Sequence, residues 1–219
     1  MKFISFRNYK KEGSWFDHYY RHNPQNPVGD DPEPIALAIK PLIPDHITTI
    51  INFGCANGRD FIPFQDKYKL IGFDLVPGEY IEWVCNTDNL TYYQCSIEDY
   101  ITTHIPSSPE DLSKTLVYTS GTLMYLQKPG YNNDPQYKQL LIPGKSKIRS
   151  PQQKFISYLL EKGCRYMVFQ EYVSAFHPGK HEELFEPNLH YYSKNSHLKS
   201  YIYFDGKNLG DGDKLDDRL

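Results

Sequence analysis

The chain alternates between short runs of consecutive apolar residues and longer segments in which apolar residues recur at helical spacing. Runs rich in β-branched and aromatic residues have the length of buried strands, and they are residues 48–53, 69–74, 92–95, 115–119 and 165–171. Helical spacing marks residues 33–40, where Pro34 is tolerated in the first turn, and residues 152–162. This alternation predicts an α/β fold with a doubly wound, mostly parallel sheet and helices on both faces.

Both ends of the chain depart from this alternation. Residues 189–204 carry two aromatic runs, which predict an antiparallel hairpin at one edge of the sheet. Residues 205–219 are polar and rich in glycine, so we expect a loosely held tail. A turn-rich stretch with four prolines or glycines ends the first 32 residues, which we expect to form an appendage to a core at 33–204. The whole is predicted to be one domain.

Composition narrows the function classes. A chain of 219 residues with 39% hydrophobic residues and a net charge of −3 is typical of a globular domain with no general attraction for nucleic acid. Nothing approaches the roughly 20 consecutive apolar residues of a membrane span, and the expected location is the cytoplasm. The four cysteines lack a C-x-x-C spacing, which favours reduced thiols over a zinc site. We expect a monomer or a homodimer.

The most informative chemistry follows the first two predicted strands. Gly54, Ala56 and Gly58 come directly after the first strand, and small residues there let the backbone approach a ligand closely. Asp74 ends the second strand, where an acid reaches ribose hydroxyls. Arg59 occupies the position at which a dinucleotide fingerprint requires its last glycine, so a loop that cradles a pyrophosphate is disfavoured.

Taken with residues 95–99 and 117–126, the loop at 50–59 and the acid at 72–74 resemble the four cofactor-site segments of class I S-adenosylmethionine-dependent methyltransferases. The resemblance covers about residues 48–173 and includes the order of the segments. It implies S-adenosylmethionine as the cofactor. The cofactor-binding residues that it implies are Asn52, Gly54, Cys55, Ala56, Asn57, Gly58, Arg59, Asp74, Leu75, Cys95, Ser96, Ile97, Thr119, Ser120 and Gly121.

The same resemblance assigns a role to each segment. Residues 54–58 are expected against the methionine part of the cofactor, and Asp74 is expected to hold both ribose hydroxyls. Residues 95–97 are expected to border the adenine, and residues 119–122 to lie near the sulfonium. Arg21 or Arg59 is a candidate partner for the cofactor carboxylate.

Three positions depart from the family pattern. Asn52 stands where the family usually has an acid, Ala56 replaces the middle glycine, and Cys95 or Ser96 replaces an aspartate beside the adenine. Asn52 still offers an acceptor oxygen, and alanine is small. These departures keep open the alternative of a non-catalytic module with a methyltransferase-like fold.

The residues after the fourth strand bear on the methyl acceptor. Residues 119–122 lack the Asp/Asn-Pro-Pro-aromatic run that the resemblance implies for members that methylate a base amine, and they lack the aspartate that it implies for metal-dependent members. A metal-free reaction on a small-molecule or sugar-like acceptor is therefore favoured. Methylation of a hydroxyl calls for a general base, and His177 and His181 after the fifth strand are the candidate catalytic residues, although loop histidines are often only surface polar groups.

Two other segments and two other reactions were weighed. The aromatic residues 15–22 suit either a lid over the site or a helix packed on the sheet. Residues 127–150 form a long connection with a basic run at Lys145, Lys147 and Arg149, which suits either an acidic acceptor or a solvated face. Small-molecule N-methylation, which needs no base, is the alternative reaction. RNA methylation is disfavoured by the net charge.

Overall fold

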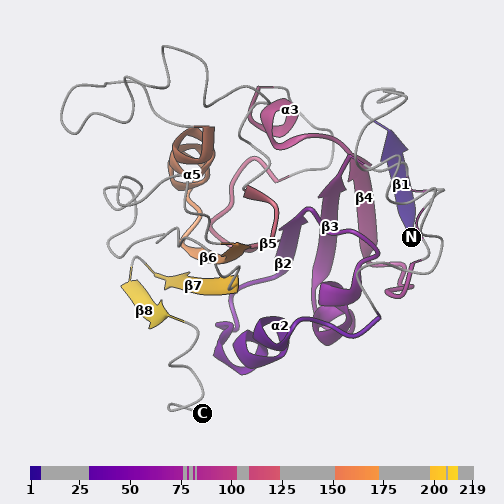
Figure 1. Ribbon diagram of the computed structural model, residues 1–219, viewed down its shortest axis with the longest axis horizontal. Helices are drawn as coiled ribbons and strands as arrows, with labels where there is room; N and C mark the ends of the chain where they lie inside the picture. The colour runs from indigo at the N-terminus through magenta and orange to yellow at the C-terminus, as the bar shows by residue number, and fades with distance from the viewer. Residues whose placement is uncertain are drawn as a thin grey trace.

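The computed structural model describes residues 1–5, 30–75, 78, 81, 83–102, 109–123, 151–172, 198–205 and 207–211. These residues form an eight-stranded sheet with the order β1-β4-β3-β2-β5-β6-β7-β8 (Figure 1). The strands are β1 (Lys2–Ser5), β2 (Thr49–Phe53), β3 (Lys69–Asp74), β4 (Leu90–Gln94), β5 (Thr115–Ser120), β6 (Tyr166–Tyr172), β7 (Leu198–Phe204) and β8 (Lys207–Asp211). The predicted doubly wound α/β fold is confirmed.

The six strands from β1 to β6 pair with one another in parallel. β7 and β8 then run antiparallel at the edge beside β6, as predicted for the C-terminal hairpin. Residues 189–192, predicted as part of that hairpin, lie outside the described residues. Lys207–Asp211 pairs with β7, so the prediction of a loosely held tail is wrong for this stretch. Glycine and polar residues hid an edge strand whose stability comes from pairing with β7.

The opposite edge holds a strand that the sequence did not indicate. β1 pairs in parallel with β4, with Lys2 opposite Thr91 and Ser5 opposite Gln94. The start of the predicted appendage is therefore part of the sheet. A four-residue strand at an edge is too short to give a period in the sequence, which explains why the pattern missed it.

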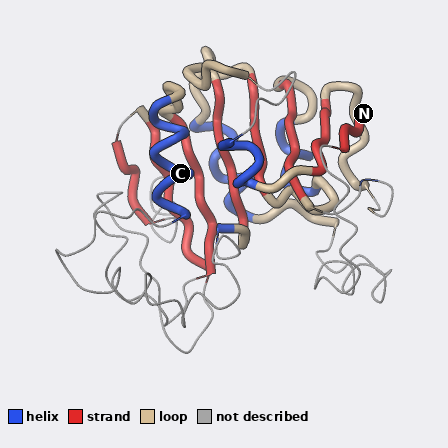
Figure 2. Tube along the Cα trace, turned by 90° about the horizontal axis from the view of Figure 1, so that it is seen from above, coloured by secondary structure: helices blue, strands red, loops and turns tan. Residues whose placement is uncertain are grey.

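Helices cover both faces of the sheet (Figures 1 and 2). On one face lie α2 (Pro34–Ile39) and the 3₁₀ helices η1 (Lys40–Leu42) and η2 (Arg59–Phe64), which enclose one hydrophobic core. On the other face lie α3 (Ile97–Thr102) and α5 (Pro151–Glu161), which enclose a second core. Both faces of the central strands are buried, which is why these strands read as continuous apolar runs rather than as alternating ones.

The segment after the glycine loop, which is residues 54–58, is the 3₁₀ helix η2. η2 contains Pro63, which lacks a backbone N–H and crowds the preceding turn. Phe61 and Phe64 of η2 are nevertheless fully buried against the sheet. The short helix therefore returns the chain to the core within a few residues of the loop.

A close contact between the glycine loop and β3 gives the first prediction. A Cβ added at Gly72 would lie 2.7 Å from Cys55 Sγ and 3.3 Å from Phe61 Cε2. Overpacking of this kind costs about 1–3 kcal/mol, so we expect Gly72→Ala to lower the free energy of unfolding by about 2 kcal/mol. Cys55→Ala removes the sulfur, and the double variant should be more stable than the sum of the two single effects predicts.

Urea denaturation of the two single variants and the double variant measures this coupling. Additive effects within about 0.3 kcal/mol would contradict the close packing of residue 72 on residue 55.

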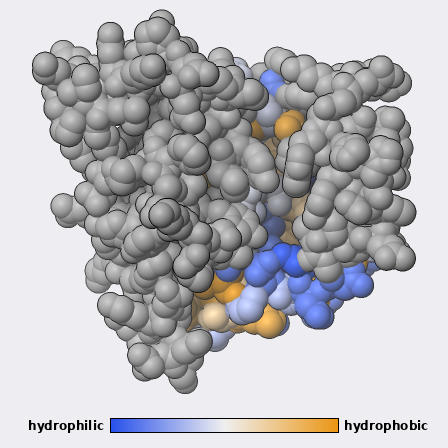
Figure 3. All heavy atoms as spheres, in the orientation of Figure 1, coloured by the Kyte–Doolittle hydropathy of each residue, from blue (hydrophilic) through white to orange (hydrophobic). Residues whose placement is uncertain are grey.

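The surface of the described residues is mixed in polarity. Around α2, hydrophilic and hydrophobic residues lie side by side (Figure 3), and Leu37 of this helix is 54% exposed. Within the part of the chain that the structure describes, no helix has both the length and the apolar character that crossing a membrane requires.

Candidate cofactor site

The segments singled out in the sequence meet at the carboxyl ends of the central strands. β2, β3, β4 and β5 are parallel neighbours, so their carboxyl ends lie together. The register places Phe53 between Phe73 and Thr119, and Asp74 opposite Gln94. The glycine loop, Asp74, residues 95–97 and residues 119–121 thus follow four adjacent strand ends.

The glycine loop turns sharply at alternate positions. Gly54, Ala56 and Gly58 have φ angles of 73°, 46° and 79°, all in the left-handed region that disfavours side chains. Gly54 N donates to Phe73 O at 2.7 Å, and Gly58 N donates to Cys55 O at 2.8 Å. The small residues at alternate positions are therefore required by the backbone, and Ala56 adopts a conformation for which glycine is the usual residue.

Asp74 is tied to this loop by its carboxylate. Oδ2 accepts from Ala56 N at 2.9 Å, and Oδ1 accepts from Leu75 N at 2.7 Å. The residue is 8% exposed. Both carboxylate oxygens are therefore oriented by backbone N–H groups, one from the glycine loop and one from the residue after β3.

The next strand end starts a helix. Ser96 Oγ accepts from Asp99 N at 3.0 Å and donates to Asp99 Oδ2 at 2.9 Å, which caps α3. Gln94 Nε2 donates to Leu75 O at 3.2 Å and joins the ends of β3 and β4. The side chain of Ser96 therefore has a local structural role, and its backbone remains at the edge of the site.

Several of the residues that the resemblance implies for the cofactor site have buried side chains. Cys55, Cys95 and Thr119 are at most 3% exposed, and the two cysteines belong to the two hydrophobic cores. Gly54, Ala56, Leu75, Ser120 and Gly121 are only partly buried and lie at the surface of the strand ends.

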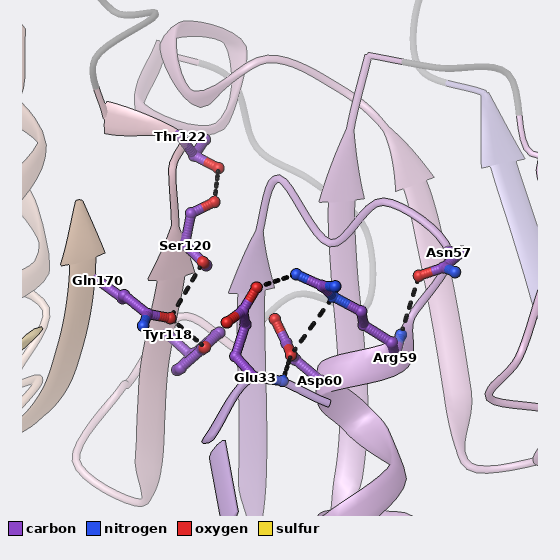
Figure 4. A network of polar contacts seen from close by, with 8 residues as sticks. All are labelled: Glu33, Asn57, Arg59, Asp60, Tyr118, Ser120, Thr122 and Gln170. Atoms are coloured by element: carbon purple, nitrogen blue, oxygen red, sulfur yellow. Dashed lines mark hydrogen bonds and ion pairs between the residues drawn. The ribbon is translucent and has the colours of Figure 1, made fainter. Parts of the chain in front are cut away.

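A network of polar side chains lies beside the loop on the α2 face (Figure 4). Arg59 donates to Glu33 Oε1 and lies 3.9 Å from Asp60 Oδ1. In the same network, Gln170 Oε1 accepts from Ser120 Oγ at 3.3 Å and from the hydroxyl of Tyr118 at 3.5 Å. Arg59, a candidate partner for the cofactor carboxylate in the sequence analysis, is thus ion-paired within the chain.

Burial raises the pKa of Asp60 and raises that of Tyr118 well above its ordinary value; for Tyr118 the nearby carboxylate of Asp60 adds to the effect. Sequence reasoning missed Glu33, Asp60 and Gln170. Gln170 alone carried a signal, because it directly follows the apolar run 166–169 of a predicted strand.

Asn52, another departure from the family pattern, leaves a buried polar atom without a partner in the described part of the chain. It is 1% exposed, and its Oδ1 has no hydrogen-bond partner among the described residues. It lies between Gly72 and Tyr118 in the register of the sheet. A buried acceptor without a partner costs free energy, so this position favours a donor from water or from a bound molecule.

Three of the four buried thiols have a raised pKa. Burial raises the pKa of Cys55 well above its usual value, with Asp74 adding to the effect, and burial raises the pKa of Cys85 to about 11 and that of Cys164 to about 12. Thiols with such values stay protonated near neutral pH. Within the described ranges, no three His, Cys, Asp or Glu residues are grouped so that they could hold a metal ion.

Other predicted functional residues lie outside the described residues. These are the candidate bases His177 and His181, Arg21 with the aromatic segment 15–22, and the connection at 127–150.

Comparison with known proteins gives structural likenesses only. No family model matches the sequence, and no curated protein matches it. A structure solved in work on the conversion of a disulfide bond into a thioacetal group during echinomycin biosynthesis is 16% identical, covers 73% of this chain and 59% of its own, and has a TM-score of 0.46. A SAM-dependent methyltransferase from Archaeoglobus fulgidus is 15% identical over 71% of this chain and 59% of its own, with a TM-score of 0.41.

The sugar N-methyltransferase KedS8 from Streptoalloteichus is 11% identical over 77% of this chain and 58% of its own, with a TM-score of 0.42. This chain therefore spans less than two thirds of the length of these solved structures. None of the likenesses identifies an activity of this chain.

Proposed function

We propose that this protein is an S-adenosylmethionine-dependent methyltransferase that methylates a hydroxyl of a small-molecule or sugar-like acceptor without a metal. The observation that carries the proposal is the carboxylate of Asp74, held at 2.9 Å by Ala56 N of the glycine loop and at 2.7 Å by Leu75 N. An acid fixed in this way beside a loop of small residues suits an adenosine whose ribose hydroxyls donate to it.

The residues at the strand ends fit this cofactor. Asp74 would hold the ribose, the backbone of residues 95–97 would border the adenine, and residues 54–58 would lie against the methionine part. The left-handed angles at Gly54 and Gly58 support this role, because they favour residues without a side chain, and a loop of small residues lets its backbone approach a ligand closely. Asn52 Oδ1, which has no hydrogen-bond partner among the described residues, would accept a hydrogen bond from a donor bound beside the loop.

The chemistry in this proposal comes from positioning. The bound cofactor supplies a methyl group on a positively charged sulfur, and transfer requires the acceptor atom to be in line with it. Ser120 and Gly121 at the end of β5 would form the floor near that group. His177 or His181 would accept the proton of an attacking hydroxyl.

An amine acceptor needs no such base, so small-molecule N-methylation is the alternative within the same fold. A non-catalytic binding module is the alternative outside catalysis, and the departures at Asn52 and Ala56 and the missing acid near Ser96 keep it open.

The proposal is tested with a titration followed by a product analysis. We expect calorimetry with S-adenosylhomocysteine to give a dissociation constant in the micromolar range, and adenosine alone to bind more weakly. Incubation of cell extract with the protein and a methyl-labelled donor should then give a labelled product, and its mass and fragmentation tell O- from N-methylation. No heat at millimolar S-adenosylhomocysteine would overturn the proposal, and binding without any labelled product would favour the non-catalytic module.

A further inference from the structure

Glu33 connects the start of α2 to the exit of the glycine loop. Its backbone N–H donates to Asp60 Oδ1 at 2.8 Å, and its side chain accepts from Arg59. It thus contacts the first two residues of η2 across 26 and 27 positions of sequence (Figure 4). Glu33 itself does not lie in the glycine loop or at a strand end.

Arg59 also contacts the glycine loop. Its backbone N–H donates to Asn57 Oδ1 at 3.2 Å, and Asn57 O accepts from Val84 N at 3.1 Å. Gly58, between them, is in the left-handed region with a φ of 79°. Arg59 is therefore held at its side chain by Glu33 and at its backbone by the loop, so a shift of the guanidinium would be transmitted to residues 57 and 58.

The ion pair is sheltered enough to matter. The side chains of Glu33 and Arg59 are each 20% exposed, and that of Asp60 is 9% exposed. The pair of Lys67 with Asp45 is much more open, with side chains 56% and 101% exposed. Exposed pairs contribute little to stability or geometry, whereas a sheltered pair resists screening and keeps a fixed geometry.

We infer that Glu33 is a positioning residue, which acts through Arg59 to hold the exit of the glycine loop in the conformation that receives the methionine part of the cofactor. This inference rests on the proposed function, because the loop is assigned to the methionine part there. The contacts of Glu33 with Arg59, and of Arg59 with Asn57, add Glu33 to the residues that shape the candidate cofactor site. Arg59 serves the loop by its pairing with Glu33.

Two ligands separate this role from a general structural one. S-adenosylhomocysteine carries the methionine-derived part, whereas 5′-methylthioadenosine keeps the adenosine and lacks the amino acid. Glu33→Gln keeps the size of the side chain and the backbone bond to Asp60, and removes the charge that holds Arg59. We expect Glu33→Gln to weaken S-adenosylhomocysteine binding about tenfold and to leave 5′-methylthioadenosine binding within twofold of the unchanged chain.

Two further variants complete the experiment. Arg59→Lys keeps the charge but loses the planar group that reaches Glu33 and Asp60, and it should give the same selective loss. Asp45→Asn removes the exposed ion pair with Lys67 and should leave the affinity for both ligands unchanged. Thermal unfolding of each variant reports its fold.

The outcomes are distinct. Failure of the unchanged protein to bind either ligand would remove the proposed function and this inference with it. Binding by the unchanged protein, with equal losses for both ligands in Glu33→Gln and Arg59→Lys or with no loss in either, would overturn the inference alone.

Discussion

Asp74→Ala is expected to weaken binding of S-adenosylhomocysteine by at least about a hundredfold. In the proposed complex the carboxylate accepts from two ribose hydroxyls, and a hydrogen bond to a charged group contributes about 1.5–3 kcal/mol. Loss of two such bonds is about 3 kcal/mol or more, which is roughly two orders of magnitude in Kd. The variant also frees Ala56 N and Leu75 N, which now donate to the carboxylate, so the loop itself would lose an anchor.

Asp74→Asn separates these two effects. The amide keeps one oxygen for a backbone donor of the loop and can still donate to a ribose oxygen, but it has no charge. We expect a loss of about tenfold, between the unchanged chain and the alanine variant, because one charged acceptor becomes neutral.

A matched control is available at the opposite ends of the strands. Asp111 also accepts from a backbone N–H and a hydroxyl, both of Ser113, at 2.9 Å, but it precedes β5 and so lies at the amino ends of the strands. These hydrogen bonds, that of the backbone first, lower the pKa of Asp111. Asp111→Ala should leave the affinity for S-adenosylhomocysteine unchanged in calorimetry. Equal affinity in Asp74→Ala and the unchanged chain would exclude the assigned role of Asp74.

The central strands were predictable because both of their faces are buried. Residues 69–74 were predicted as a strand and form β3 with the same bounds, and the run at 115–119 became β5, Thr115–Ser120. A continuous apolar run is what two covering helical layers require, so the pattern carries the layer architecture as well. The placement of the loop and Asp74 at neighbouring strand ends follows from that sheet.

The edges and the polar network were not predictable for a different physical reason. β1 and β8 gain their stability from a neighbouring strand, and their own sequences carry little hydrophobic pattern. The pairing of Glu33 with Arg59 depends on how α2 packs against η2, which a linear pattern does not contain. Pro63 disfavours a regular α-helix after Gly58 but does not specify the helix type, so the 3₁₀ geometry of η2 does not follow from the sequence.

Gly54→Ala is expected to lower the free energy of unfolding by about 3 kcal/mol and to abolish S-adenosylhomocysteine binding at millimolar ligand. A residue with a side chain at a φ of 73° is strained, at a cost of about 1–3 kcal/mol. The added Cβ would also overlap Thr122 Oγ1 and lie 2.8 Å from Thr122 Cγ2 and 2.9 Å from its Cβ. Relief of this overlap must move either the loop or the end of β5, and Thr122 donates to Ser120 O at 3.0 Å there.

Gly163→Ala is the control that isolates the overlap from the backbone strain. Gly163 has a similar φ of 82°, but an added Cβ would meet Asp111 Oδ1 at 3.3 Å and nothing else closer than 3.8 Å. It lies between α5 and β6, at the edge of the sheet away from the loop. We expect Gly163→Ala to cost about 1–2 kcal/mol and to keep the affinity of the unchanged chain.

Replacing Thr122 by glycine in the Gly54→Ala background removes the overlap and leaves the strain. Chemical denaturation should then recover about 1–2 kcal/mol of the lost stability, within the range that overpacking costs. Binding should recover only if the displaced part was the end of β5, because the strain at residue 54 stays in the loop. Equal stability losses in Gly54→Ala and Gly163→Ala, with no recovery in the double variant, would contradict the contact between the glycine loop and Thr122.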